Sequence, residues 1–243
     1  MKKIISTALV AAGLVMASQA EAISITPLLM FASGNNNVQT ITVSNEDTST
    51  AYVQVTPKLI KNAGMPNSSI TVYTPGGNPK EFGLMVSPLK LALPANTDRN
   101  IRLVALNTNP AQDQFYEVSI TTIAPPAAST AAETVAGGSS ANATIGISYA
   151  AKLLVLAKNP LPVVSAKRSG STITITNTGN SYISLRNGQL CNTSGNNCSA
   201  LPASQNYQVL FVGNSWSFTT SAPGVVKFEG VYAQDKSMSV SSN

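Results

Sequence analysis

Short runs of apolar or alternating apolar and polar residues follow one another along the chain, each bounded by Gly, Pro, Asn or Ser. Side chains of a strand alternate between two faces with a period of two, so these runs predict strands. No segment shows a sustained helical period. The expected strands are residues 24–29, 38–45, 51–60, 70–73, 84–87, 90–93, 99–105, 115–123, 145–156, 163–167, 172–177, 183–189, 208–210, 215–219 and 225–232.

The spacing of these runs predicts an all-β chain. Turn residues recur at intervals of about 8–12 residues, which is typical of antiparallel sandwiches. Residues 159–162 read Asn-Pro-Leu-Pro, and the two prolines make this segment a stiff, extended connector. We therefore expect an N-terminal domain at residues 23–160 and a C-terminal domain at residues 161–243.

The first 22 residues have the pattern of a signal peptide. Lys2 and Lys3 form a positive segment, residues 4–16 an apolar one, and Ala20-Glu21-Ala22 a small-x-small cleavage site. The apolar segment is shorter than a membrane span requires, although an uncleaved anchor remains the alternative. Residues 1–22 are therefore expected to direct export. They have the short length typical of a bacterial signal peptide, so we expect the protein to be located in the periplasm.

Composition argues against several classes of function. Charged residues make up 10% of the chain, the formal net charge is +5, and histidine is absent. Without histidine the Ser-His-Asp and Cys-His mechanisms and most zinc sites are excluded, and no Walker or Rossmann glycine pattern is present. The Lys and Arg residues form no cluster interleaved with aromatic residues, so nucleic-acid binding has little support. We expect a non-enzyme without a cofactor or metal.

Two cysteines, Cys191 and Cys198, enclose the loop NTSGNN. In an exported protein such a pair predicts a disulfide bond, here one that closes a hairpin. Two isolated thiols are the alternative. A metal site would need further ligands nearby.

Residues 137–160 are the most informative stretch for function. Four side chains fall on one face if this segment is a strand: Ala143, Ile145, Ile147 and Tyr149. Lys152 then interrupts a run of aliphatic residues. We interpret this segment as a strand edge that lends side chains to another chain, with Ile145 and Ile147 as the central members of the row.

Four segments resemble, in order, the periplasmic pilus chaperones of the chaperone–usher pathway, the PapD-like family. They are FGLMVSPLKLALPANTDRNIRLVAL (82–106), QFYEVSITTIAPP (114–126), ISYAAKLLVLAKNP (147–160) and TITITNTGNSYISL (172–185). The cysteine pair that follows is similar to that of the alternate branch, which assembles thin fimbriae of the colonisation-factor type.

The resemblance implies two immunoglobulin-like β-sandwiches arranged as an L or boomerang. It also implies a chaperone that binds fimbrial subunits by donor-strand complementation and delivers them to an outer-membrane usher. The donor strand would then be the row Ala143, Ile145, Ile147 and Tyr149. Lys152 would bind the C-terminal carboxylate of the subunit. Arg102 would be the second cation, because the first strand has none.

Several alternatives stay open from the sequence. The chain could itself be an exported fimbrial subunit or adhesin, or a carbohydrate-binding sandwich, although Trp216 and the tyrosines form no evident aromatic platform. Lys152 could be a lysine at a strand end that extends to solvent, and Arg102 could form a surface salt bridge. Since an apolar edge is costly to leave bare, a further hypothesis is that the free protein caps itself as an oligomer.

Overall fold

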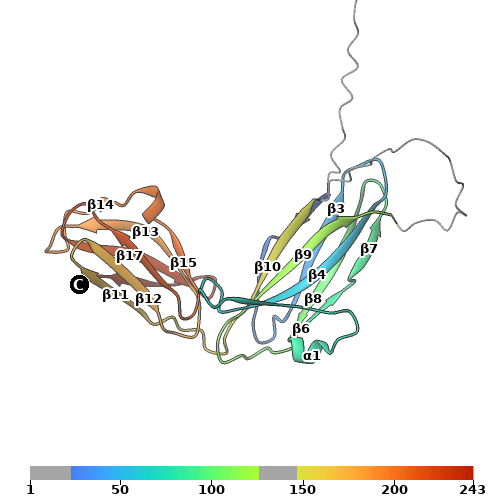
Figure 1. Cartoon of the computed structure of the whole chain (residues 1–243), viewed down its shortest axis with the longest axis horizontal. Coiled ribbons are helices and arrows are strands. Elements are labelled where there is room, and N and C mark those ends of the chain that lie inside the picture. The colour runs from blue at the N-terminus through green and yellow to red at the C-terminus, as the bar shows by residue number, and fades with distance from the viewer. Residues whose placement is uncertain (1–22, 126–146, 243) are drawn as a thin grey trace, which may run out of the picture.

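The computed structural model describes residues 23–125 and 147–242, which form two β-sandwiches set at an angle to each other (Figure 1). This is the all-β, two-domain architecture that the strand pattern predicted. The strands of the N-terminal sandwich are β1 (Ile23–Thr26), β2 (Leu29–Ala32), β3 (Val38–Asn45), β4 (Ala51–Lys61), β5 (Ser69–Val72), β6 (Leu84–Ser87), β7 (Lys90–Leu93), β8 (Thr97–Ala105), β9 (Gln114–Ile123) and β10 (Ser148–Val155).

These strands form two sheets. The order in one, here called the back sheet, is β1-β3-β8-β6. The order in the other, called the cleft sheet, is β2-β10-β9-β4-β5, with β7 also paired to β4. A short helix, α1 (Pro79–Phe82), precedes β6. It begins with Asn78 as N-cap and ends at Gly83, which adopts a left-handed conformation that glycine tolerates well.

The C-terminal sandwich is built from the remaining strands. They are β11 (Val164–Ser169), β12 (Thr172–Asn177), β13 (Ile183–Cys191), β14 (Ser199–Ala200), β15 (Gln208–Leu210), β16 (Ser215–Thr219), β17 (Val225–Tyr232) and β18 (Lys236–Ser241). One sheet has the order β11-β12-β16 and the other β14-β13-β17-β18, with β15 paired to β13. A single 3-10 turn, η1 (Ala203–Gln205), lies in the described part of this domain.

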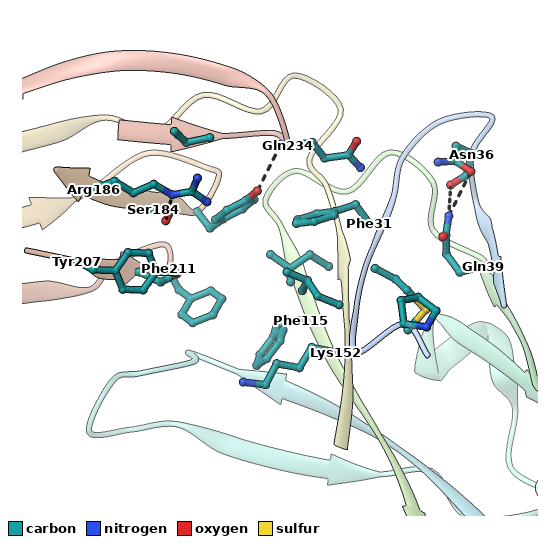
Figure 2. Close-up of a pocket in the computed structure, with 17 residues that line it drawn as sticks. Phe31, Asn36, Gln39, Phe115, Lys152, Ser184, Arg186, Tyr207, Phe211 and Gln234 are labelled. Atoms are coloured by element: carbon teal, nitrogen blue, oxygen red, sulfur yellow. Dashed lines mark hydrogen bonds between the residues drawn. The ribbon is translucent and has the colours of Figure 1, made fainter. Parts of the chain in front are cut away.

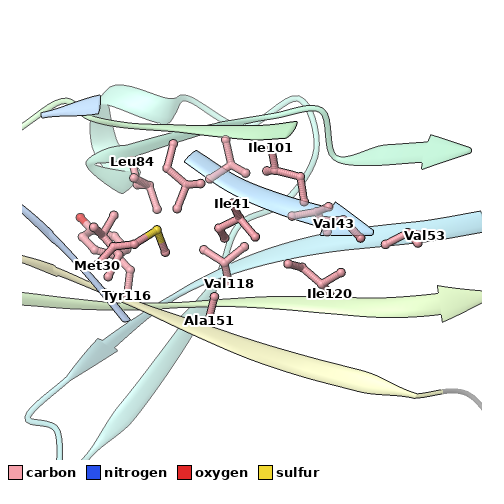
Figure 3. Packing of buried hydrophobic residues seen from close by; sticks show 14 of the residues in the cluster. Met30, Ile41, Val43, Val53, Leu84, Ile101, Tyr116, Val118, Ile120 and Ala151 are labelled. Atoms are coloured by element: carbon pink, nitrogen blue, oxygen red, sulfur yellow. The ribbon is translucent and has the colours of Figure 1, made fainter. Parts of the chain in front are cut away.

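Each sandwich encloses its own apolar core. In the N-terminal domain Ile41, Ile101 and Leu103 of the back sheet face Tyr116 and Leu153 of the cleft sheet, and all are fully buried. Figure 3 shows Ile41, Ile101 and Tyr116 within this packing. In the C-terminal domain the core is built from other side chains, chiefly Ile173, Ile175, Ile183, Leu185, Phe218 and Phe228. Alternate residues of each strand supply these side chains, as the period of two predicted.

The chain changes sheet at its start. The sequence predicted one strand at residues 24–29, but β1 pairs with β3 in the back sheet and β2 pairs with β10 in the cleft sheet. Pro27 lies between them and has no backbone N–H with which to continue a ladder. As a result, β2 covers only part of the edge of β10.

The predicted disulfide is confirmed: Cys191 at the end of β13 is bonded to Cys198. Gln189 and Leu190 of β13 pair with Ala200 and Ser199 of β14, so the bond closes a hairpin. Among the described residues, none of the helices has the length and apolar character that crossing a membrane requires.

Reduction of this disulfide is expected to lower the free energy of unfolding of the C-terminal domain by about 2.5 kcal/mol. The two cysteines are seven residues apart, and closing so short a loop restricts the unfolded chain by about that amount. Urea titrations followed by the fluorescence of Trp216, the single tryptophan, would measure the change. A Cys191→Ser/Cys198→Ser variant should match the reduced protein and be insensitive to reductant; equal stability with and without the bond would contradict the expectation.

Candidate functional site

A cleft of about 720 Å³ opens between the two sandwiches (Figure 2). The N-terminal domain contributes residues of β2, β9 and β10, and the C-terminal domain contributes residues of β13, β15 and β17. The lining side chains are Pro27, Leu29, Met30, Phe31, Asn36, Gln39, Phe115, Lys152, Leu154, Tyr182, Ser184, Arg186, Tyr207, Val209, Phe211, Val231 and Gln234. They are mostly apolar and aromatic and include two cations and no carboxylate.

Aromatic contacts join the two domains beneath this cleft. The ring of Phe31 stacks on that of Tyr182 with centroids 5.8 Å apart, and Phe115 meets Phe211 at 5.1 Å. Both pairs belong to a cluster around the buried side chain of Leu154. Burial raises the pKa of Tyr182, whose hydroxyl oxygen accepts a hydrogen bond from the backbone N–H of Gln234. The contacts give the cleft a fixed apolar floor.

The outward face of the cleft sheet carries two rows of side chains that cross its strands. The first, the apolar row, contains Phe31, Leu154, Phe115, Ile60 and Ile70. The second, called the charged row, lies two residues away from the first on each strand. It contains Leu29, Lys152, Glu117, Lys58 and Val72. Directly opposed side chains in neighbouring strands lie close together, so the lysine of the cleft is bordered by apolar side chains and by one carboxylate.

Lys152 lies in the cleft on β10, with an exposed side chain. Within the described residues the one salt bridge joins Lys58 to Glu117, with 3.0 Å between Nζ and Oε1. The hydrogen bond from Lys58 holds the pKa of Glu117 below its ordinary value, and the charge of Lys152 adds to this effect. Lys152 therefore faces the cleft as a cation without an ion pair in this part of the chain.

Arg102 occupies a different surface. It lies on β8 in the back sheet, where it pairs across the strands with Thr40 and Ser87, and its side chain is exposed. The structure does not bring it together with Lys152, because the two belong to opposite sheets of the sandwich.

The second cation of the cleft is instead Arg186, on β13 of the C-terminal domain. Its Nε donates to the hydroxyl of Ser184 at 3.2 Å, and Figure 2 shows its side chain across the cleft from that of Lys152. Sequence reasoning missed Arg186 because it lies far from Lys152 in the chain and follows an ordinary strand pattern. Only the docking of the two domains places it in the cleft.

Within residues 23–125 and 147–242, the edge of β10 is open along its first half. Residues Lys152 to Val155 pair with β2 on one side and β9 on the other, whereas Ser148 to Ala151 pair only with β9 among the described residues. The backbone N–H groups of Lys152 and Leu156 donate to Leu28 and Ala32, away from β9. Because this direction alternates along a strand, the N–H of Ala150, two residues before Lys152, points to the open edge.

The predicted donor row lies only partly within the described residues. Ala143 and Ile145 lie outside them. Ile147 is half-buried just before β10 and exchanges hydrogen bonds with Thr122 through both its backbone N–H and its carbonyl. The ring of Tyr149 packs against the N-terminal core and its hydroxyl donates to the carbonyl of Ile23. In this structure Tyr149 is thus occupied within its own domain, and the donor role of the row stays a prediction.

Asp113 connects the two domains behind the cleft. Its Oδ1 accepts from the N–H of Ala157 at 2.7 Å, and its Oδ2 accepts from the hydroxyl of Ser181 at 2.8 Å and the N–H of Tyr182 at 2.9 Å. Its own N–H donates to the carbonyl of Asn180. One side chain therefore joins the start of β9, the interdomain connector and the segment before β13.

No protein-family model and no curated protein sequence matches the chain, so the comparison rests on solved structures. The crystal structure of the class 5 fimbriae chaperone CfaA has a TM-score of 0.68 at 18% identity, covering 91% of this chain and 99% of that one. A chain of a chaperone–tip adhesin complex of CFA/I fimbriae has a TM-score of 0.66 at 20% identity and covers 91% and 98%.

A chain of the SafA pilin–SafB chaperone complex of Salmonella enterica has a TM-score of 0.55 at 13% identity, covering 93% of this chain and 97% of that one. In all three comparisons the likeness extends over both sandwiches and nearly the full length of the solved chain. The chain therefore has the two-sandwich fold of the chaperone–usher fimbrial chaperones.

Proposed function

We propose that this chain is a non-enzymatic periplasmic chaperone that binds fimbrial subunits by donor-strand complementation and delivers them to an outer-membrane usher. The observation that carries the proposal is the open edge of β10, which ends beside Lys152 in an apolar cleft. A strand edge offers backbone hydrogen bonds, an apolar groove offers burial, and a cation fixes one end of the ligand.

The physical logic concerns the subunit as much as the chaperone. A sandwich that lacks a strand exposes a groove and unpaired backbone groups, which is an aggregation hazard. The edge of β10 can pair with such a groove, and the row Ala143, Ile145, Ile147 and Tyr149 would supply its side chains. Each buried aliphatic side chain contributes about 1.5–3 kcal/mol, so a few suffice to hold a subunit.

Lys152 is the proposed site for the C-terminal carboxylate of the subunit. A carboxylate that enters an apolar cleft loses water and must find a counter-ion, or its desolvation opposes binding. Lys152 and Arg186 are the cations that line this cleft, one from each domain. Arg102, on the back sheet, serves as the matched control because it removes the same charge from a surface outside the cleft.

Two of the similar solved structures contain partners of the expected kind, a tip adhesin in one and a pilin in the other. The comparisons give no support to the alternative in which the chain is itself a fimbrial subunit.

The proposal is tested by periplasmic co-expression with the fimbrial subunits of the same organism, followed by purification and size-exclusion chromatography. The wild-type protein is expected to recover a subunit in a one-to-one complex, and Lys152→Ala to lower the affinity at least tenfold, since truncating one partner of a buried charge pair costs about 2–5 kcal/mol. Arg186→Ala should weaken the complex and Arg102→Ala should not. Failure of the wild-type protein to protect any subunit from proteolysis would overturn the proposal.

A further inference from the structure

Three charged side chains lie side by side on neighbouring strands at the rim of the cleft. Glu117 of β9 is directly opposite Lys58 of β4 on one side and Lys152 of β10 on the other. Side chains opposed in this way have Cβ atoms about 5 Å apart. The carboxylate of Glu117 can therefore reach either lysine, and the choice between them decides whether Lys152 is free.

The structure shows which lysine Glu117 contacts. Its Oε1 accepts from Nζ of Lys58 at 3.0 Å and from the hydroxyl of Ser119 at 3.2 Å. The contact with Lys58 directs the carboxylate toward β4 and away from β10, and the hydroxyl of Ser119, on β9 itself, holds the same oxygen. Within the described residues Lys152 has no carboxylate within salt-bridge distance. The lowered pKa of Glu117 is consistent with a full negative charge at neutral pH.

We infer that Lys58 is a positioning residue, which keeps the ammonium group of Lys152 available for a ligand carboxylate by holding Glu117 on the other side. The inference rests on the proposed carboxylate site at Lys152. It assigns to Lys58 and Glu117 the control of whether the ammonium group of Lys152 is free to pair with a ligand. Neither residue lines the cleft, and Lys58 acts through Glu117 rather than on the ligand.

The physical argument is one of competition between two anions for one cation. If Lys58 loses its charge, the nearest directly opposed cation for Glu117 is Lys152. An ion pair formed there would have to be broken before a ligand carboxylate could bind. The free energy needed to break this ion pair is that of a partly exposed pair. It would weaken ligand binding by about fivefold at most.

The experiment uses the full exported protein and a synthetic strand peptide of alternating Val and Thr residues, with either a free C-terminal carboxylate or a C-terminal amide. Lys58→Met should weaken binding of the carboxylate peptide by about threefold to fivefold and leave the amide unaffected. Lys58→Met/Glu117→Gln should restore the wild-type affinity. Lys90→Met removes a lysine from β7, which also pairs with β4, and should change neither.

Two results would overturn the inference. If the double variant stays as weak as Lys58→Met, then Lys58 binds the ligand directly. If Lys58→Met binds the carboxylate peptide as tightly as the wild-type protein, Glu117 does not compete for Lys152.

A measurement without ligand separates this inference from the proposed function. The NMR signals of the Lys152 side chain should shift in Lys58→Met, as Glu117 pairs with it, and return in the double variant. Shifted signals combined with equal binding of the two peptides would leave the control by Glu117 intact and reject the carboxylate site. Signals that do not move in Lys58→Met would reject the positioning role itself.

Discussion

An Ala150→Pro variant is expected to fold and to bind the proposed partner, a fimbrial subunit, with an affinity lower by about 10- to 100-fold. The N–H of Ala150 points to the open edge of β10, so a proline there removes a hydrogen bond that the incoming strand needs while the ladder to β9 stays intact. A backbone carbonyl left without a donor in the bound state costs about 1–3 kcal/mol, which gives the expected range. Titration calorimetry with the purified subunit would measure it.

Ala150→Ser provides the matched control because it changes the side chain and keeps the N–H. It should bind the subunit as the wild-type protein does, and both variants should unfold at the wild-type temperature. Normal subunit binding by Ala150→Pro would show that the open edge of β10 does not pair with the partner, and would reject strand complementation on this edge.

Replacing Asp113 by Ala is expected to lower the free energy of unfolding by about 3 kcal/mol and to uncouple the two sandwiches. The substitution leaves the N–H groups of Ala157 and Tyr182 and the hydroxyl of Ser181 without their acceptor. All three residues are buried, and a buried donor without a partner costs about 1–3 kcal/mol. Asp113 precedes β9 of the N-terminal domain, whereas these donors belong to the connector and the C-terminal domain. Losing the three hydrogen bonds therefore weakens the attachment of one sandwich to the other.

Two probes would detect the uncoupling. Trp216 packs against Phe218 in the C-terminal core and reports that domain alone, whereas far-UV circular dichroism reports both. The two urea transitions should coincide in the wild-type protein and separate in Asp113→Ala. Coincident transitions in the variant would contradict the proposed role. Asp98→Ala, at an exposed position of β8 in the N-terminal domain, is the control.

The contribution of Asp113 should also depend on pH with a defined sign. Burial raises the pKa of its carboxyl above the ordinary value of 3.8, against the effect of its three hydrogen bonds. The folded state therefore binds the proton more tightly than the unfolded chain, and stability falls as the pH rises through this raised pKa. Compared with Asp113→Asn, the wild-type protein should gain stability on acidification toward pH 3.8, and a loss over that range would contradict the assigned direction.

Local sequence patterns predicted most of the strands. Residues 38–45, 84–87, 90–93, 172–177, 208–210, 215–219 and 225–232 form strands with the expected bounds. The pattern missed β18, where Met238 and Val240 alternate with small polar residues and give too weak an apolar signal. It also joined β1 and β2 into one strand, because periodicity does not record which sheet a strand joins.

The charged residues of the site also differ in whether the sequence revealed their position. Lys152 was recognisable because it interrupts an aliphatic run within its own strand. Arg102 and Arg186 each lie in unremarkable strand patterns, and local spacing does not distinguish the exposed back sheet from the cleft. Asp113 gave no signal either, since its partners lie about 44 and 69 residues further along the chain.

The sequence by itself determined the β class, most of the strands and the disulfide, because alternation and short loops are local properties of the chain. The tertiary structure decided which strands share a sheet, which part of β10 stays open, and which cation faces Lys152. Those features depend on long-range pairing and on the docking of two domains, whose energies come from contacts between residues far apart in the chain.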